Sequence, residues 1–198
     1  MRVVLATHNA HKVAEFQAIL GTELPELEIV AYDGPEPVED GTTFAENALI
    51  KARTAAAHTG LPALADDSGI CVDVMGGAPG IFSARWAGHG RGSDANLALL
   101  VDQLADVHEG DRGAEFACHI AIVVPETGFE TVVAGTWRGR LARTPHGGGG
   151  FGYDPLFIPE GSEITAAELT ADEKNAVSHR ARAFAEAIPV LRTSLIPD

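Results

Sequence analysis

The chain has 198 residues, a net charge of −14 and a hydrophobic content of 45%. Its size and composition are those of one domain or two closely joined lobes with a sizeable core, and they exclude a disordered chain. The negative charge, with no basic run to offset it, excludes a nucleic-acid polymer as the partner. A small anionic substrate stays possible, because a local group of cations can outweigh a distant screened field.

Targeting signals and cysteine usage indicate the compartment. No apolar run is long enough to cross a bilayer, and Met1 leads straight into a strand-like segment without a signal-peptide pattern. Cys71 and Cys118 form no C-x-x-C pair, so we expect two reduced thiols, although one disulfide stays open. We therefore expect a cytoplasmic protein without membrane contact.

The hydrophobic pattern predicts strands and helices that alternate early, followed by a long pair of neighbouring strands. This order favours an α/β fold in which helices pack on a mixed sheet. The predicted strands lie at 2–6, 28–31, 64–74 (one or two strands), 115–124, 130–141 and 156–158. The predicted helices run from the cap Asn9 to Leu20, over 43–59 with Thr43 as the cap and Gly60 as the stop, and from the cap Ser93 to Leu104. A C-terminal helix carries Val177, Ala181, Phe184, Ile188 and Leu191 on one stripe.

Lysine is rare in this chain, which contains only Lys12, Lys51 and Lys174 among 14 basic residues. Either chance placed these three lysines, or they occupy positions that require a compact ammonium group. Lys12 lies in the first turn of a helix, where free N–H groups attract anions. The alternative there is an ordinary Asn9 cap beside a solvated lysine.

Lys51 gives a sharper signal, because it falls about 20° from Phe44 on the inner side of helix 43–59. A buried ammonium needs a partner, whereas a side chain that reaches the rim does not. Glu39-Asp40 and Asp66-Asp67 are acidic pairs in turn-favouring surroundings. Converging carboxylates suit Mg²⁺, although such pairs are also common as solvated loops.

The glycine run at 147–152 contains G-x-G-x-x-G, but Tyr153-Asp154-Pro155 follows where a dinucleotide site would begin a helix. We expect the glycines to let the backbone fold tightly and present Phe151 and Asp154. The sequence has no P-loop, no G-x-S-x-G elbow and no H-E-x-x-H motif.

Together, these segments resemble the inosine/xanthosine triphosphate pyrophosphatase family, in the family's order and over nearly the whole chain. His8 and His11 depart from the residues common there. The matching blocks are Thr7-x-Asn9-x-x-Lys12, Glu39-x-Gly41-x-Thr43-Phe44, Glu46-Asn47-Ala48, Lys51-Ala52, Ala65-Asp66-Asp67-Ser68-Gly69, Gly76-Gly77-Ala78-Pro79-Gly80, Ser83-Ala84-Arg85, Gly149-Gly150-Phe151-Gly152-Tyr153-Asp154-Pro155, Ala167-Glu168-Leu169, Glu173-Lys174-Asn175 and Ser178-His179-Arg180.

The resemblance implies one two-lobed domain over residues 1–198, with an elongated, twisted mixed sheet, flanking helices and a central cleft. It also implies a homodimer that cleaves ITP, dITP and XTP to the monophosphate and pyrophosphate with Mg²⁺. The implied metal ligands are Glu39 and Asp67, and the implied catalytic residues are Asp67, as the base for the attacking water, and Lys51. The implied substrate-binding residues are Thr7, His8, Asn9, Ala10, His11, Lys12 and Ser68 for the phosphates, and Phe151, Gly152, Tyr153, Asp154, Lys174, His179 and Arg180 for the base.

One geometric point concerns Lys174 and His179, which would point about 140° apart on an unbroken helix. We therefore expect Ser178 to cap the helix and Lys174 to fold back from the preceding turn; the alternative is a solvated helix start. Two other functions stay open at this point. They are a phosphatase with Asp66 or Asp67 as its nucleophile, and a nucleotide-binding module without catalysis.

Overall fold

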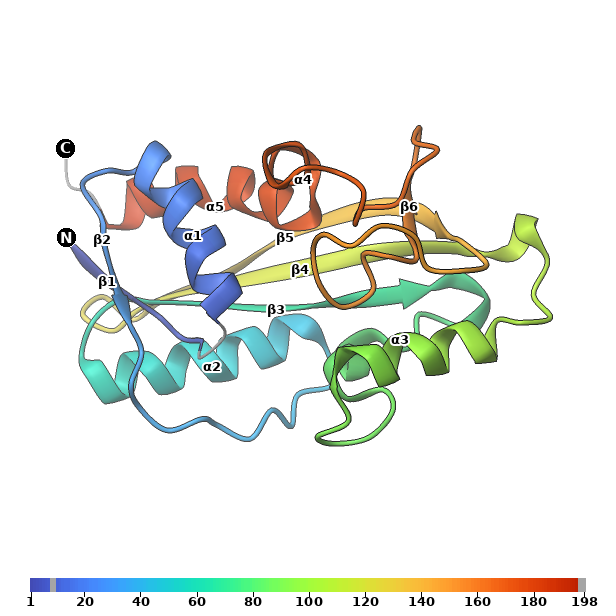
Figure 1. Ribbon diagram of the computed structural model, residues 1–198. Helices are drawn as coiled ribbons and strands as arrows, with labels where there is room; N and C mark the ends of the chain where they lie inside the picture. Colours follow the sequence, from blue (N-terminus) through green and yellow to red (C-terminus); the bar gives the residue numbers. More distant parts are fainter. Residues whose placement is uncertain (8–9, 196–198) are drawn as a thin grey trace. The chain divides into compact units, whose positions relative to one another are not determined.

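Six strands form one sheet in the order β2-β1-β3-β4-β5-β6 in the computed structural model, which describes residues 1–7 and 10–195 (Figure 1). Strand β1 pairs in parallel with β2 and β3, whereas β6 is antiparallel to β5, so the sheet is mixed. This confirms the predicted α/β class. The strands are β1 Arg2–Leu5, β2 Glu28–Ala31, β3 Ala63–Val72, β4 Gly113–Val124, β5 Phe129–Leu141 and β6 Phe157–Pro159.

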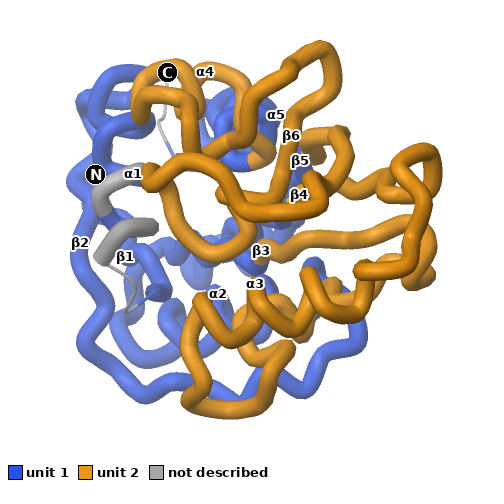
Figure 2. The backbone as a smooth tube through the Cα atoms, turned by 45° about the vertical axis from the view of Figure 1, so that its right-hand side comes forward, with its two compact units in different colours: residues 1–67, 118–135, 180–198 blue, residues 68–117, 136–179 orange. Residues whose placement is uncertain are grey.

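The described helices follow the predicted order, and the C-terminal helical segment is divided at Ser178. They are α1 Ala10–Glu23, α2 Phe44–Thr59, α3 Gly92–Gln103, α4 Ala171–Val177 and α5 His179–Leu195, with short 3-10 helices at Asp73–Met75, Gly80–Arg85 and Glu109–Asp111. The chain divides into two compact units. Unit 1 comprises residues 1–67, 118–135 and 180–198, and unit 2 comprises residues 68–117 and 136–179 (Figure 2).

Side chains alternate along the strands of unit 1, and this alternation builds two separate cores. Leu64 of β3 packs in one cluster with residues of α1 and α5, including Phe16 and Phe184. Its strand neighbours Ala63 and Ala65 pack in the other cluster, with alanines of α2. Unit 1 therefore has α1 and α5 on one face of its strands and α2 on the opposite face.

Unit 2 has a core of its own, in which α3 contributes Leu100 and Leu104 and the strands contribute Trp137 and Phe157. Arg112 is also buried there, with 1% of its surface exposed. Its guanidinium donates hydrogen bonds of 2.7–2.8 Å to the carbonyl oxygens of Leu104, Leu141 and Ala142. The buried cation thus joins the end of α3 to the end of β5.

Helix α2 begins and ends where the sequence predicts. The Thr43 side chain accepts from the Glu46 N–H, and the Glu46 side chain accepts from the Thr43 N–H, which makes a complete capping box. Gly60 ends the helix in the left-handed conformation, at φ 69°, and its N–H donates to Ala56 O.

Two predictions for the other helices are wrong. Ser93 does not cap α3, because the helix is bounded at Gly92 and Arg91 occupies the cap position without a side-chain hydrogen bond. Val177 is not part of a buried stripe, because it ends α4 and is 42% exposed. The buried stripe of α5 consists of Ala183, Phe184, Ala187, Leu191 and Leu195.

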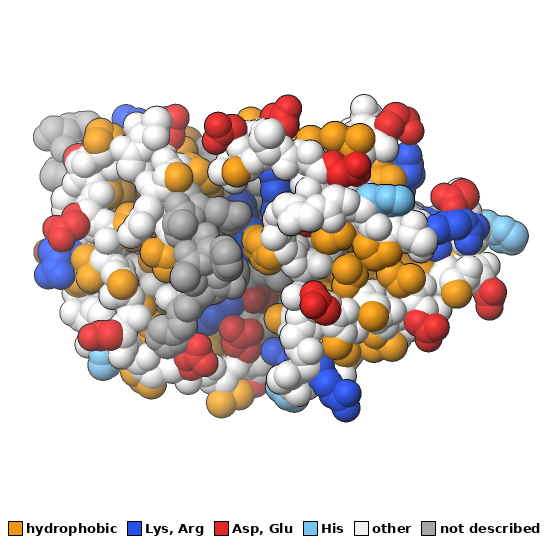
Figure 3. Space-filling view, viewed as in Figure 1, with side chains coloured by type: hydrophobic (Ala, Val, Ile, Leu, Met, Phe, Trp, Pro, Cys, Tyr) orange, Lys and Arg blue, Asp and Glu red, His pale blue; other side chains and the backbone are white. Residues whose placement is uncertain are grey.

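Both cysteines are free thiols, as expected from the sequence; Cys118 is buried and Cys71 is partly buried. Burial raises the pKa of the Cys71 thiol to about 11, so it stays protonated at neutral pH. Acidic side chains are spread over the face in Figure 3 and do not gather into one patch. Within residues 1–7 and 10–195, no helix is long and apolar enough to span a membrane.

Candidate active site

Lys51 lies between two carboxylates in unit 1. Its ammonium nitrogen Nζ donates a 2.8 Å hydrogen bond to Asp67 Oδ1 and lies 3.1 Å from Glu39 Oε1. The side chains of Lys51 and Asp67 are 13% and 12% exposed, and that of Glu39 is 30% exposed. Lys51 is therefore a paired, partly buried ammonium group. Of the two interpretations of the sequence, this is the paired lysine and not the lysine that reaches the rim.

The segment before α2 is held against the start of that helix. The backbone N–H of Gly41 donates to Asn47 Oδ1 at 2.9 Å, and Asn47 Nδ2 lies 3.5 Å from Asp67 Oδ2. A side chain on Gly41 would bring its Cβ within 2.6 Å of Asn47 Oδ1, so this close approach requires glycine. Asn47 thereby connects the segment that carries Glu39 to the carboxylate of Asp67.

Opposing effects act on the pKa of Lys51. Burial favours the neutral amine, but the negative charges of Asp67, Asp66 and Glu39 outweigh it and raise the pKa above its ordinary value. Lys51 is therefore a fixed positive charge at neutral pH and cannot serve as a general base. The group able to accept a proton beside it is a carboxylate.

The donor set of this group fits Mg²⁺. Glu39 and Asp67 offer carboxylate oxygens, and they already converge on one cation, the ammonium of Lys51. Magnesium commonly uses one or two protein carboxylates and completes its shell with water and substrate phosphates. No group of three or more His, Cys, Asp or Glu side chains that could hold a metal ion occurs among the described residues.

Sequence reasoning missed His119, a residue of β4 on the same side of the sheet as Asp67. Its neighbours Ala121 and Val123, two and four residues on, belong to the core cluster on the α2 face. The imidazole stacks on the Phe44 ring, with centroids 5.6 Å apart and planes at 16°. Burial lowers the pKa of His119, and the negative charge of Asp67 partly offsets this. Strict alternation of side chains between the two sheet faces along 115–124 could have placed His119 on the α2 face.

Asp66 has surroundings different from those of Asp67. Its Oδ2 lies 3.7 Å from Arg180 Nε, and the two side chains are 1% and 6% exposed. The acidic pair of the sequence is therefore divided between two partners, Lys51 for Asp67 and Arg180 for Asp66.

A second group of predicted residues comes together in unit 2. Lys174 Nζ donates to Asp154 Oδ2 at 2.6 Å and lies 4.9 Å from the centroid of the Phe151 ring. The same carboxylate oxygen accepts from the backbone N–H of Phe151 at 2.8 Å. Gly150 makes this arrangement possible, because its φ is 68° and a Cβ there would clash with Asp154 Oδ2.

The predicted break between Lys174 and His179 is confirmed. Ser178 is extended, with φ −67° and ψ 164°, and separates α4 from α5. Lys174 lies one turn before the break and is buried. Beyond the break, the His179 imidazole stacks on the Phe116 ring with centroids 4.9 Å apart and planes at 14°.

The remaining predicted residues have more varied surroundings. Tyr153 is buried, and its hydroxyl donates to Ser83 O at 2.9 Å. This side chain therefore anchors the end of the glycine-rich loop at 147–152. Gly152 has a φ of 64°, and Ser68 is partly exposed on β3. Thr7 follows β1. His8 and Asn9 lie outside the described residues, as do the side chains of Ala10, His11 and Lys12.

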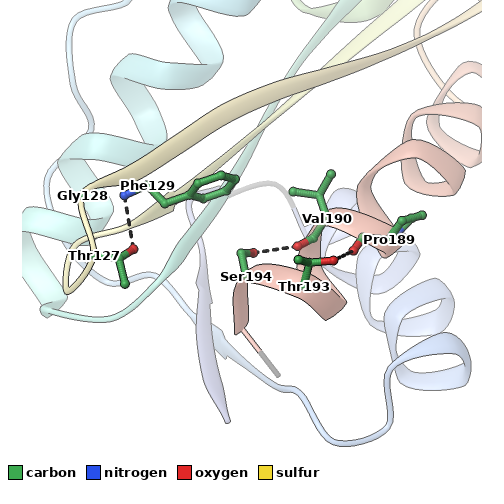
Figure 4. Close-up of a pocket in the computed structure, with 7 residues that line it drawn as sticks. All are labelled: Thr127, Gly128, Phe129, Pro189, Val190, Thr193 and Ser194. Atoms are coloured by element: carbon green, nitrogen blue, oxygen red, sulfur yellow. Dashed lines mark hydrogen bonds between the residues drawn. The ribbon is translucent and has the colours of Figure 1, made fainter. Parts of the chain in front are cut away.

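Unit 1 has a pocket of about 780 Å³, and none of the described residues that line it is a predicted site residue (Figure 4). Hydroxyls on its wall are bonded to the backbone, as Thr193 is to Pro189 O and Ser194 to Val190 O. Among the described residues that line the pocket there is no cationic side chain. Its lining consists of Thr127, Gly128, Phe129, Pro189, Val190, Thr193 and Ser194.

Comparisons with known proteins agree with the fold and with the sequence blocks. The sequence profile of the Ham1 family matches residues 3–190. A dITP/XTP pyrophosphatase of Leifsonia xyli is 65% identical over 97% of this chain and 96% of its own length. One from Streptomyces avermitilis is 54% identical over 98% of each chain.

Solved structures agree as well. A HAM1 protein from Coxiella burnetii is 40% identical, with a TM-score of 0.89 over 98% of this chain and 100% of its own. A dITP/XTP pyrophosphatase from Mycobacterium abscessus is 48% identical, with a TM-score of 0.78 over 97% of this chain and 100% of its own. From its sequence and its fold together, this chain belongs to the Ham1 family.

Proposed function

We propose that this chain is a hydrolase that converts non-standard purine nucleoside triphosphates, namely ITP, dITP and XTP, to the monophosphate and pyrophosphate, which removes them from the nucleotide pool. The observation that carries the proposal is the position of the Lys51 ammonium between the carboxylates of Glu39 and Asp67. The names of the relatives, dITP/XTP pyrophosphatases from several bacteria, support the same substrates.

The phosphates are assigned in part to Lys51. An ammonium has three donors, and the contacts with Glu39 and Asp67 occupy two of them, so Lys51 can direct one toward a phosphate oxygen. Thr7 to Lys12 and Ser68 are assigned to the same phosphates by the family resemblance. Such preorganised positive charge stabilises the charge that develops during attack on phosphorus.

Mg²⁺ is the proposed cofactor, with Glu39 and Asp67 as its protein ligands. When bound, it would neutralise phosphate charge and polarise the phosphoryl oxygens. Because the raised pKa of Lys51 keeps that side chain protonated, the proton of the attacking water is assigned to Asp67. The Lys51 ammonium and the Asn47 amide orient the carboxylate for this task.

The base is assigned to Phe151, Gly152, Tyr153, Asp154, Lys174, His179 and Arg180. Hypoxanthine and xanthine carry an acceptor oxygen at position 6, where adenine carries a donor amino group. Lys174 and Arg180 are donors and therefore favour the 6-oxo bases, because an adenine amino group would face another donor. The Phe151 ring can stack on any purine and so adds affinity without selecting the base.

The two alternative functions give different outcomes in assays. A phosphatase with an aspartate nucleophile would release orthophosphate, and the buried pairing of Asp66 with Arg180 disfavours Asp66 in that role. A binding module would hold nucleotide without turnover. We further propose, from the family resemblance, that the protein is a cytoplasmic homodimer. Sedimentation equilibrium measures its oligomeric state and tests the homodimer.

Metal dependence tests the proposed chemistry. We expect pyrophosphate release from dITP to stop in excess EDTA and to return when Mg²⁺ is added beyond the chelator. Undiminished turnover in EDTA would rule out the assigned metal role.

A further inference from the structure

Neighbouring residues of a β-strand point to opposite faces of the sheet, and this separates Asp66 from Asp67 in β3. Leu64, two residues before Asp66, packs in the cluster formed with α1 and α5. Ala65, two residues before Asp67, packs in the cluster formed with α2. The alternation therefore places Asp66 on the α5 side and Asp67 on the α2 side.

The ion pairs follow the same division. Asp67 meets Lys51 of α2, whereas Asp66 lies 3.7 Å from the Nε of Arg180, the second residue of α5. Both members of the Asp66–Arg180 pair are almost fully buried, at 1% and 6% exposure of the side chain. Burial of a guanidinium without a compensating carboxylate is strongly unfavourable, so Asp66 supplies negative charge that the buried Arg180 requires.

We infer that Asp66 is a positioning residue for purine selection, which holds the guanidinium of Arg180 and takes no part in binding the metal. The inference rests on the proposed function, because it takes Arg180 as a residue that recognises the 6-oxo group. Adjacent aspartates then serve the two ends of one substrate: Asp67 acts on the phosphates, and Asp66 acts through Arg180 on the base.

A role for Asp66 as a second metal ligand is the competing reading of the acidic pair. It conflicts with the strand alternation, which directs Asp66 away from the α2 face where Lys51, Glu39 and Asp67 meet. Asp66 still influences that group over a distance, because its negative charge contributes to the raised pKa of Lys51. A selectivity measurement and a metal titration separate the two roles.

The experiment compares the full-length variants Asp66→Asn, Arg180→Met and Asp66→Asn/Arg180→Met, using the ITP-to-ATP ratio in kcat/KM. Asp66→Asn is expected to lower the ratio about tenfold or more, because it removes the charged partner of a buried ion pair. If Asp66 acts only through Arg180, the double variant will match Arg180→Met alone. An unchanged ratio in Asp66→Asn, or additive losses in the double variant, would overturn the inference.

The metal titration uses the same proteins. The Mg²⁺ concentration for half-maximal activity is expected to stay within about twofold of wild type in Asp66→Asn and to rise in Glu39→Gln. An equal rise in both variants would show that Asp66 is a metal ligand. Asp73→Asn makes the same chemical change in an exposed ion pair with Arg138 and should leave the ITP-to-ATP ratio unchanged.

Folding and the parent activity are controlled separately. If Asp66→Asn does not fold, Asp66→Ala/Arg180→Met, which removes both charges, is compared with Arg180→Met; a further fall in the ratio would overturn the inference. Absence of ITP turnover in the wild-type protein would contradict the proposed function itself, whereas turnover with an unaffected ratio contradicts only the role of Asp66.

Discussion

The ammonium of Lys51 donates a 2.8 Å hydrogen bond to the carboxylate of Asp67 across the interface between α2 and β3. This contact joins the two motifs that are most distinct in the sequence, although 16 residues separate them. It also fixes the protonation of the group, since the carboxylates raise the pKa of the lysine despite its burial.

Asp67→Asn and Lys51→Ala are expected to lower kcat about 10²–10³-fold each, the usual cost of removing one preorganised charge from such a centre. Arg53→Ala is the matched control, because it removes an exposed cation from the same helix, paired with Glu130. Turnover and thermal unfolding should be measured on the same preparations. Activity of both site variants within a few-fold of wild type would show that the catalytic centre lies elsewhere.

Lys174→Met is expected to narrow the ITP-to-ATP ratio in kcat/KM, because it removes a donor assigned to the 6-oxo group. It also leaves the buried Asp154 carboxylate without its 2.6 Å partner, so a lower Tm should accompany the change. The matched control is Arg140→Met, which removes an exposed cation paired with Glu163. Equal losses on ITP and ATP would instead assign Lys174 to phosphate binding or to structure.

Helix α2 should lose stability in acid through its capping box. Hydrogen bonds from Thr42 and Thr43 hold the pKa of Glu46 below its ordinary value of 4.5. A lowered pKa in the folded state stabilises the fold above pH 4.5, and this contribution is lost as the pH falls through the folded-state pKa. Glu46→Gln should therefore show a smaller fall in Tm between pH 7 and the acid range than wild type.

The exposed Glu126, in the turn after β4, provides the control for that titration. Glu126→Gln should keep the pH dependence of wild type. Identical slopes of Tm against pH for Glu46→Gln and wild type would mean that the capping box does not carry the predicted linkage.

Arg112→Lys is expected to lower the free energy of unfolding by about 1–3 kcal/mol, because the ammonium cannot reach all three carbonyl acceptors and leaves a buried acceptor without a donor. Arg143→Lys changes an exposed arginine, paired with Glu109, and should be nearly neutral. The urea concentrations at the midpoint of unfolding should be compared for Arg112→Lys and Arg143→Lys. Equal midpoints for the two variants would contradict a structural role for the buried guanidinium.

The sequence predicted helix and strand boundaries well wherever a particular residue type, such as a capping threonine or a glycine, sets the local backbone conformation. Thr43, Glu46 and Gly60 fixed both ends of α2, and the helical period placed Lys51 on its inner side. Ser93 failed as a cap because the helix is bounded one residue earlier, at Gly92, where a φ of 81° turns the chain into α3. Val177 failed because the break at Ser178 shifts the helical phase.

The candidate site was less accessible from sequence, because its contacts join distant segments. Nothing local shows that Asp66 meets Arg180 while Asp67 meets Lys51, since this depends on which helix covers each face of β3. Arg112 resembles any surface arginine until its three carbonyl partners are seen. The roles assigned to Glu39, Asp67 and the purine-reading residues remain predictions.

The most direct test of the central claim is hydrolysis of dITP in ¹⁸O-labelled water with Mg²⁺ present. Attack of water on the α-phosphorus, with Asp67 as the base, predicts unlabelled pyrophosphate and one labelled oxygen in the deoxyinosine monophosphate. Label in the pyrophosphate, or release of orthophosphate as the first product, would contradict it.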